Sequence, residues 1–344
     1  MKKLILLLLI CVPLQLYAVS SEEKKLVALF DEIWDFEMTS DPVTATYIGY
    51  PGQNTNWPDY SLQTVKKQQL RWKKLLKSLR AIKRDALEER ASFDWLLVEK
   101  YMADKVAGFS FPEEYILIYQ LGGVQQDVAQ ALEIMPKNKP GDFKDRLVRL
   151  GKVDDLIDQT IVVLREGLKK GVTPPSITLR DVPDQIRNVI PAKVEDSPLL
   201  SSFNGYPASV SKDEQEKINS RAVKIVRDEL YPAYTRLLEF IEKEYIPGSV
   251  SSIAMKDLPN GKDWYHHRAR HFTTLDMKPK LIHELGLREV KRIRSEMDKA
   301  IADSGFKGSF AEFTEFLRTD PQFFVDTPDE LLMRYRDIAK RADP

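Results

Sequence analysis

Two of the four histidines in this chain are spaced so that they could hold a metal ion. His267 and His271 are four residues apart, which places them on one face of a helix about one turn from each other. That spacing can chelate zinc, but a zinc-peptidase helix carries a general-base Glu directly after the first His. Arg268 stands there in this chain, and Arg270 also opposes a cation. The two histidines are therefore weak metal candidates, and the alternative is a helix-surface or cleft-lining role.

A second metal motif begins at His283 and fails. His283-Glu284 starts an H-E-x-x-H pattern, but its second histidine would be residue 287, which is Leu287. The sequence around His283 favours a histidine near a helix start, above an apolar face.

Other catalytic signatures are missing from the sequence. It contains no G-x-S-x-G serine-hydrolase motif, no phosphate-binding G-x-x-x-x-G-K-[ST] loop and no G-x-G-x-x-G. Its one cysteine, Cys11, lies in the leader described next, which leaves no thiolate for catalysis or for a metal. Residue types and spacing alone therefore do not identify an active site.

The first 18 residues have the pattern of a cleavable signal peptide. Lys2 and Lys3 precede an apolar run over residues 4–12, and Ala18 offers a cleavage point. The run is shorter than the roughly 20 residues that span a bilayer, which disfavours a retained anchor. A lipoprotein signal at Cys11 is disfavoured because Ile10 precedes it where a small residue is needed. We expect an exported protein, periplasmic or secreted, without a stable membrane anchor.

Charge and length restrict the function of the mature chain. Removing residues 1–18 leaves 50 basic and 52 acidic residues, a net charge of −2. No clustered basic face is apparent, which argues against nucleic acid as a partner. The remaining length suits one large helical body or two smaller lobes.

Hydrophobic periodicity predicts an all-α protein, a large multi-helix body with at most a short β-hairpin or strand pair. Apolar residues recur at helical spacing in most segments, including one long helix over residues 143–170 and another that starts at Ser211 and contains Pro232. Pro232 is expected to kink that helix. Further starts are predicted at Pro279, Ser309 and Thr327 from proline and capping-box patterns. Residues 250–255 are the one candidate strand, and no fixed repeat supports a solenoid.

Four sequence blocks resemble the bacterial family catalogued as domain of unknown function 885. The resemblance runs from about residue 24 to the end of the chain, and the most specific block contains Trp264-Tyr265, His271, Thr273-Thr274 and the run Ile282-His283-Glu284-Leu285-Gly286-Leu287. The matching blocks are residues 41–50, 146–175, 230–247 and 261–297.

This resemblance implies a fold and an activity. The family is similar to zinc metallopeptidases of the thermolysin-like clan, with a helical body resembling the angiotensin-converting-enzyme type. Such enzymes use zinc and a general-base Glu to hydrolyse peptides. The same resemblance makes Tyr265, His271, Thr273 and His283 candidates for lining a substrate cleft, with packing and capping as their alternative role.

The chain departs from the family in its metal segment. Full-length members carry a His-Glu and then Pro-Gly-His-His downstream of the matched blocks, and this sequence has neither. We therefore expect residues 19–344 to be the N-terminal helical region of such a protein, truncated, without catalysis and without bound zinc. The alternative is a stand-alone, non-catalytic helical protein that binds peptides or a protein partner.

If the chain is truncated, its last helices should expose an apolar patch, because helices that normally pack on the missing half lose the partner that covers them. The residues expected in such a patch are Phe313, Phe316, Leu317, Phe323, Phe324, Leu331 and Leu332.

Overall fold

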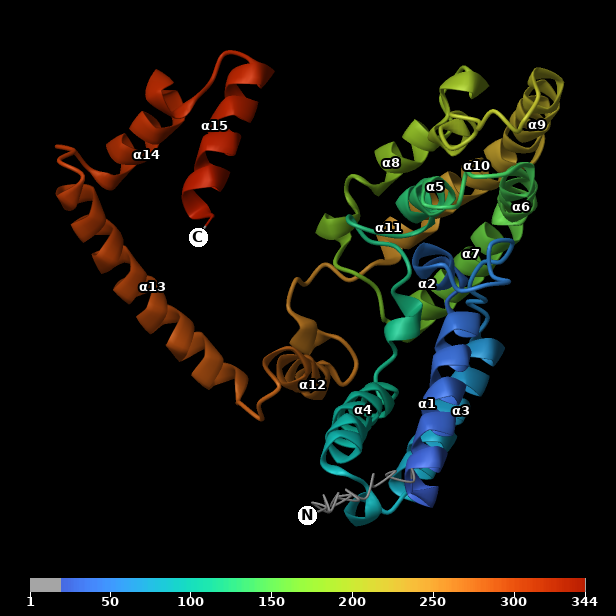
Figure 1. Ribbon diagram of the computed structural model, residues 1–344, viewed down its shortest axis with the longest axis horizontal. Coiled ribbons are helices and arrows are strands. Elements are labelled where there is room, and N and C mark those ends of the chain that lie inside the picture. Colours follow the sequence, from blue (N-terminus) through green and yellow to red (C-terminus); the bar gives the residue numbers. More distant parts are fainter. Residues whose placement is uncertain (1–19, 344) are drawn as a thin grey trace, which may run out of the picture. The chain divides into compact units, whose positions relative to one another are not determined.

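The structure, a computed structural model, describes residues 20–343, and the chain divides into two compact units. The first unit extends to His267 and the second begins at Arg268, so the boundary falls inside helix α12 (Gly261–Thr273) (Figure 1). Regular structure in the described range is helical, which confirms the all-α prediction. The predicted signal peptide lies outside the described residues.

The first unit begins with a bundle of three long helices. These are α1 (Ser21–Ser40), α3 (Leu62–Arg80) and α4 (Glu89–Gly108), and α1 and α3 lie side by side in Figure 1. A capping box at Ser20 and Glu23 starts α1. The short helix α2 (Pro42–Ile48) follows α1 and ends at Gly49, whose φ of 81° is left-handed. The buried core of this bundle consists of Leu26, Leu29, Ile33, Trp72, Leu75, Leu76, Leu79, Ile82 and Met102.

A larger core lies among the helices that follow within the same unit. Helix α7 packs on α10, α6 packs on α9, and α5 packs on α8. The helices are α5 (Val124–Glu133), α6 (Pro140–Leu150), α7 (Val153–Lys170), α8 (Val182–Val189), α9 (Lys212–Ile225), α10 (Tyr231–Phe240) and α11 (Ile246–Gly248).

Two prolines interrupt the helix that Ser211 caps. A π-helical turn, Val226–Leu230, precedes Pro232, and a second, Ile241–Tyr245, precedes Pro247. A proline has no N–H to donate to the preceding turn and crowds its carbonyl, and a π turn is one way for the helix to absorb that conflict. The chain therefore continues as α9, α10 and α11, with the capping box of Ser211 and Glu214 at its start as expected.

The prediction of one helix over residues 143–170 was wrong, because the chain forms two helices there. Helix α6 ends at Leu150, Gly151 follows it, and α7 starts at Val153. The side chain of Trp57 donates a hydrogen bond to the carbonyl of Arg149, with Nε1 and O 2.8 Å apart. That carbonyl belongs to the last turn of α6, so a contact from a distant segment helps to satisfy the end of the helix.

The predicted strand at residues 250–255 was also wrong. That segment has no regular structure up to a 3₁₀ turn at Met255–Asp257, and the amide of Val250 donates instead to the hydroxyl of Thr173, 3.0 Å away. Within residues 20–343 the only β feature is an isolated bridge between Tyr119 and Gly122. No helix in this range combines the length and apolar character needed to cross a membrane.

Beyond the end of α12, the described part of the second unit contains three α-helices with little buried surface. They begin where the sequence predicted, at Pro279, after Ser309 and after Thr327. A cluster of aromatic rings holds the end of α13 to α14, with ring centroids of Phe306 and Phe313 5.2 Å apart. The helices are α13 (Pro279–Asp303), α14 (Phe310–Thr319) and α15 (Pro328–Ala342).

Candidate functional site

Trp264 is a buried anchor of the first unit. Its ring is 1% exposed and contacts the core formed with Tyr115, Val163 and Val172. Its indole Nε1 donates to Oε1 of Glu113 at 3.0 Å. The polar end of the side chain is thereby satisfied while its apolar body is buried, which is the usual arrangement for a core tryptophan.

Gly261, the first residue of α12, makes this placement possible. A Cβ at this position would overlap the carbonyl oxygen of Met255. The most specific sequence block thus begins at a position where only glycine fits, because the backbone of Met255 lies so close. Three residues later the block reaches the buried side chain of Trp264. Both of these residues have structural roles.

His267 packs on an aromatic ring. Its imidazole stacks on Phe111 with centroids 5.1 Å apart and an interplanar angle of 28°, and Phe111 in turn stacks on Trp264 at 6.0 Å. The Nε2 atom lies against Gly108, 3.3 Å from where a Cβ would stand. These contacts fix His267 within the packing of the first unit.

The remaining candidates for a substrate cleft are mostly exposed. Tyr265 is 50% exposed in the first unit, and His271 and His283 are exposed in the second. Thr273 instead makes local bonds: its hydroxyl donates to the carbonyl of Ala269 at 2.7 Å and accepts from the amide of Leu275 at 3.2 Å. Thr273 therefore makes local hydrogen bonds at the end of α12.

The residues present do not fit a zinc site. Structural and catalytic zinc sites need three or four His, Cys, Asp or Glu ligands. Across residues 20–343 no group of three such side chains is close enough to hold a metal ion. His267 and His271 share helix α12, but among the described residues no third ligand completes a metal site with them.

Two arginines of α6 are a feature that sequence reasoning missed. Arg146 and Arg149 are both 0% exposed, although arginine is rarely buried. Arg149 Nη1 donates to Oγ1 of Thr46 at 3.0 Å, which joins residues 41–50 to residues 146–175, two of the blocks that carry the family resemblance. The sequence carried one sign of this burial: the two arginines are three residues apart and fall on the apolar side of a predicted helix.

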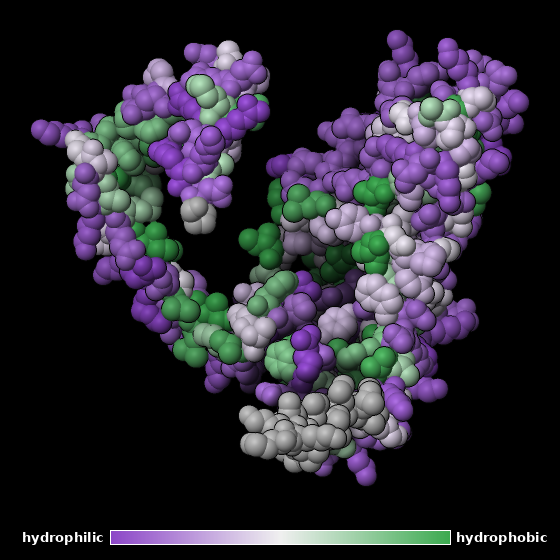
Figure 2. All heavy atoms as spheres, viewed as in Figure 1, coloured by the Kyte–Doolittle hydropathy of each residue, from purple (hydrophilic) through white to green (hydrophobic). Residues whose placement is uncertain are grey.

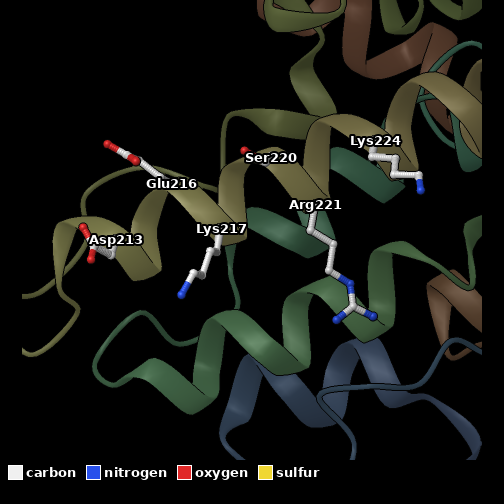
Figure 3. A pocket seen from close by; sticks show the side chains of 6 residues that line it. All are labelled: Asp213, Glu216, Lys217, Ser220, Arg221 and Lys224. Atoms are coloured by element: carbon white, nitrogen blue, oxygen red, sulfur yellow. The ribbon is translucent and has the colours of Figure 1, made fainter.

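The structure also outlines a shallow groove along α9. Lys217 and Arg221 project from one side of this helix, whereas Glu216 points away (Figure 3). All the lining residues are exposed, belong to one helix and carry mixed charge. This is a solvated helix face rather than a binding site; its residues are Asp213, Glu216, Lys217, Ser220, Arg221 and Lys224.

The second unit exposes much of its apolar surface. Helix α13 buries only Ile301, and α14 and α15 bury no residue. Apolar side chains gather along α13 in Figure 2. Leu317, Phe323, Phe324, Leu331 and Leu332 are exposed as expected, whereas Phe313 and Phe316 are half-buried within the phenylalanine cluster. Exposed patches of this kind mark surfaces that contact another protein segment.

The fold and its buried contacts define an all-α protein. The chain belongs to the family described as bacterial protein of unknown function DUF885, which it matches over residues 42–344. No curated protein matches its sequence.

A solved structure shares the fold. It is the crystal structure of a candidate lipoprotein from Colwellia psychrerythraea, with a TM-score of 0.85 and 18% sequence identity. The similarity covers 93% of this chain and 58% of that one. The chain thus spans little more than half the length of the solved protein that it resembles.

Proposed function

We propose that this chain is the N-terminal helical part of an exported metallopeptidase-like protein that hydrolyses peptides when complete. The observation that carries the proposal is the uncovered apolar face of α13, α14 and α15. A stable domain buries the apolar side of an amphipathic helix against another element. In α15 the exposed residues Leu331, Tyr335 and Ile338 follow helical spacing, so this helix has a contact face without a partner in the described residues.

Family membership and the fold neighbour agree with this proposal. Part of the solved protein has no counterpart in this chain. The corresponding part of the complete protein would supply the helices that pack on the exposed face. Its description as a candidate lipoprotein fits export, as does the signal-peptide pattern of residues 1–18. Zinc would belong to the part that carries the His-Glu and Pro-Gly-His-His segment.

Two measurements test the proposal. The first reads the genomic DNA beyond the codon for Pro344, where we expect an open frame carrying the metal segment. The second assays the purified chain on a mixed library of fluorogenic peptides, with added zinc and with chelator, beside an active zinc peptidase. We expect no zinc-dependent hydrolysis. Hydrolysis by this chain alone, or a stop codon after Pro344, would overturn the proposal.

A second function draws on the same exposed face. A stand-alone protein with an apolar helical surface would bind a peptide or a protein partner through it, as an amphipathic helix binds a groove. A stop codon after Pro344 would favour this alternative, and binding partners would then be sought in the exported fraction.

A further inference from the structure

Helix α3 is strongly basic along its whole length. It contains seven lysines and arginines and no acidic residue. Its side chains Trp72, Leu75, Leu76 and Leu79 are buried in the core of the three-helix bundle, and its lysines are exposed. Acidic residues elsewhere cancel this charge in the total of the chain. The expectation that the chain has no clustered basic face, which drew on net charge, was therefore wrong.

The two arginines of α3 make contacts within the bundle. Arg71 forms an ion pair with Glu32 of α1, and Nε of Arg80 donates to Oε1 of Glu99 on α4 at 2.9 Å. A guanidinium group suits directed contacts of this kind better than an ammonium group does. The arginines thus link α3 to the two helices that pack on it, and their charge is offset there.

Four lysines of α3 form no salt bridge among residues 20–343. All four are exposed, so their ammonium groups are open to solvent or to another molecule. The remaining lysine, Lys67, differs because its charge interacts with the carboxylate of Asp59. The four lysines are Lys66, Lys73, Lys74 and Lys77.

These lysines lie on one side of the helix with a leucine among them. Leu70, Lys73 and Lys77 follow Lys66 by four, seven and eleven residues, which is the spacing of a single helix face. At 1.5 Å per residue, the row from Lys66 to Lys77 is about 16 Å long. Leu70, in the middle of the row, is 66% exposed. We call Lys66, Leu70, Lys73, Lys74 and Lys77 the lysine face.

A row of ammonium groups around an exposed leucine suits the surface of a phospholipid membrane. Clustered lysines attract anionic lipids, and an apolar side chain beside them enters the boundary between headgroups and acyl chains. The long lysine stems let the ammonium groups reach lipid phosphates while the leucine stays between them. Nucleic acid is usually bound through arginine contacts to bases or through aromatic stacking, and the lysine face contains neither residue type.

We propose that the lysine face binds the surface of a membrane rich in anionic phospholipids, with Leu70 at the headgroup boundary. The association is electrostatic and reversible, so it is not a stable anchor. It should weaken as the salt concentration rises, because exposed charges are screened. The lysine face lies outside the proposed peptidase function, and its failure would leave that function untouched.

Vesicle flotation tests this proposal with the full chain. The wild type and every variant are compared with the same N-terminus, checked by mass spectrometry, so that any part of residues 1–18 contributes equally. The wild type should bind vesicles made of equal parts of phosphatidylcholine and phosphatidylglycerol at low salt, and sodium chloride should release it. It should not bind vesicles of phosphatidylcholine alone. Equal binding to the two kinds of vesicle would overturn the proposal.

Two pairs of substitutions locate the contact. Lys73→Gln with Lys77→Gln should weaken binding to anionic vesicles about 25-fold, since each lysine near such a surface contributes about fivefold. Lys217→Gln with Lys224→Gln is the matched control, because it removes the same charge from exposed positions of α9 and should bind like the wild type. Glutamine and lysine have similar helix propensities, so both variants should fold. An equal loss in the two pairs would contradict a specific role for α3.

A fluorescent label reports which surface touches the lipid. In a Cys11→Ser background, an environment-sensitive dye on Leu70→Cys should shift to shorter wavelength on anionic vesicles. The same dye on Val162→Cys, an exposed position of α7, should not shift. The absence of a shift at position 70 would refute the proposed contact. A DNA duplex that binds the wild type more tightly than anionic vesicles do would assign the lysine face to nucleic acid and also overturn the proposal.

Discussion

Trp264 donates a hydrogen bond from its indole Nε1 to Oε1 of Glu113, at 3.0 Å and across 151 positions of the chain. This bond fixes the start of α12 to the segment that follows α4, while the indole ring fills the core of Tyr115, Val163 and Val172. The start of α12, where the most characteristic sequence block begins, is therefore held by a core side chain.

Replacing the anchor should destabilise the first unit. Trp264→Ala is expected to cost about 4 kcal/mol, because it removes a fully buried aromatic ring and leaves a cavity. Tyr265→Ala, one residue away on the exposed side of the helix, is the matched control and should change stability by less than about 0.5 kcal/mol. Denaturant unfolding of both variants checks this. Similar losses for the two would contradict the assignment of Trp264 as the anchor.

Two buried tyrosines should respond oppositely to removal of their hydroxyls. The hydroxyl of Tyr234 donates to the carbonyl of Val124 at 2.9 Å, whereas that of Tyr245 is buried without a partner in the described range. Burial raises the pKa of both phenols, so each stays neutral and gains nothing from ionisation.

Tyr234→Phe should therefore cost about 1 kcal/mol, since it removes a buried hydrogen bond to the first turn of α5. Tyr245→Phe should be neutral or stabilising by up to about 1 kcal/mol, because it removes an unsatisfied polar atom at little change in shape. The difference in unfolding free energy between the two variants is the measurement. A loss in Tyr245→Phe as large as that in Tyr234→Phe would mean that its hydroxyl is satisfied.

Acid should weaken the start of the three-helix bundle through Glu23. The amides of Ser20 and Glu88 donate to its two carboxylate oxygens at 2.9 and 3.3 Å, and these bonds lower the pKa of Glu23 below its usual 4.5. A pKa that is lower in the folded state stabilises the protein above the unfolded pKa, and this contribution is lost as pH falls through the folded pKa.

Glu23→Gln should accordingly be less stable than wild type at pH 7, and the gap should narrow as pH falls below 4.5. Unfolding free energies measured from pH 7 to pH 3 would show this. Glu88→Gln is the control, because the side chain of Glu88 makes no capping hydrogen bond. A gap that widens in acid would contradict this role for Glu23.

The exposed face of α15 should tolerate charge. Leu331→Glu with Ile338→Glu places two carboxylates on surface that is 46% and 56% exposed, so the unfolding free energy should change by less than about 1 kcal/mol. Binding of a hydrophobic dye and self-association at high concentration should both decrease, because the apolar patch is interrupted. A large loss of stability would mean that another element covers the face.

Local signals in the sequence predicted much of the secondary structure. The capping boxes at Ser211 and Ser309 and the threonine cap at Thr327 start helices as expected, because each signal acts within four residues of backbone. The proline at position 279 likewise lies in the first turn of α13. The H-x-x-x-H spacing was also read correctly as one helix face, but spacing cannot supply the third ligand that a zinc site needs.

The tertiary structure decided what those helices do. The break between α6 and α7 depends in part on Trp57, which is 92 residues from the carbonyl that it binds, and periodicity within a window cannot register such a contact. The burial of Arg146 and Arg149 likewise depends on where α5 and α2 end in space.

By itself, the sequence thus determined the helical class, the helix starts at Ser211, Pro279, Ser309 and Thr327, and the family, since these depend on local backbone chemistry and on motif identity. Only the tertiary structure decided that Trp264 is a core anchor and that Arg146 and Arg149 are buried. An apolar stripe has the same pattern whether another element packs on it or not, because burial is a property of the surroundings and not of the stripe.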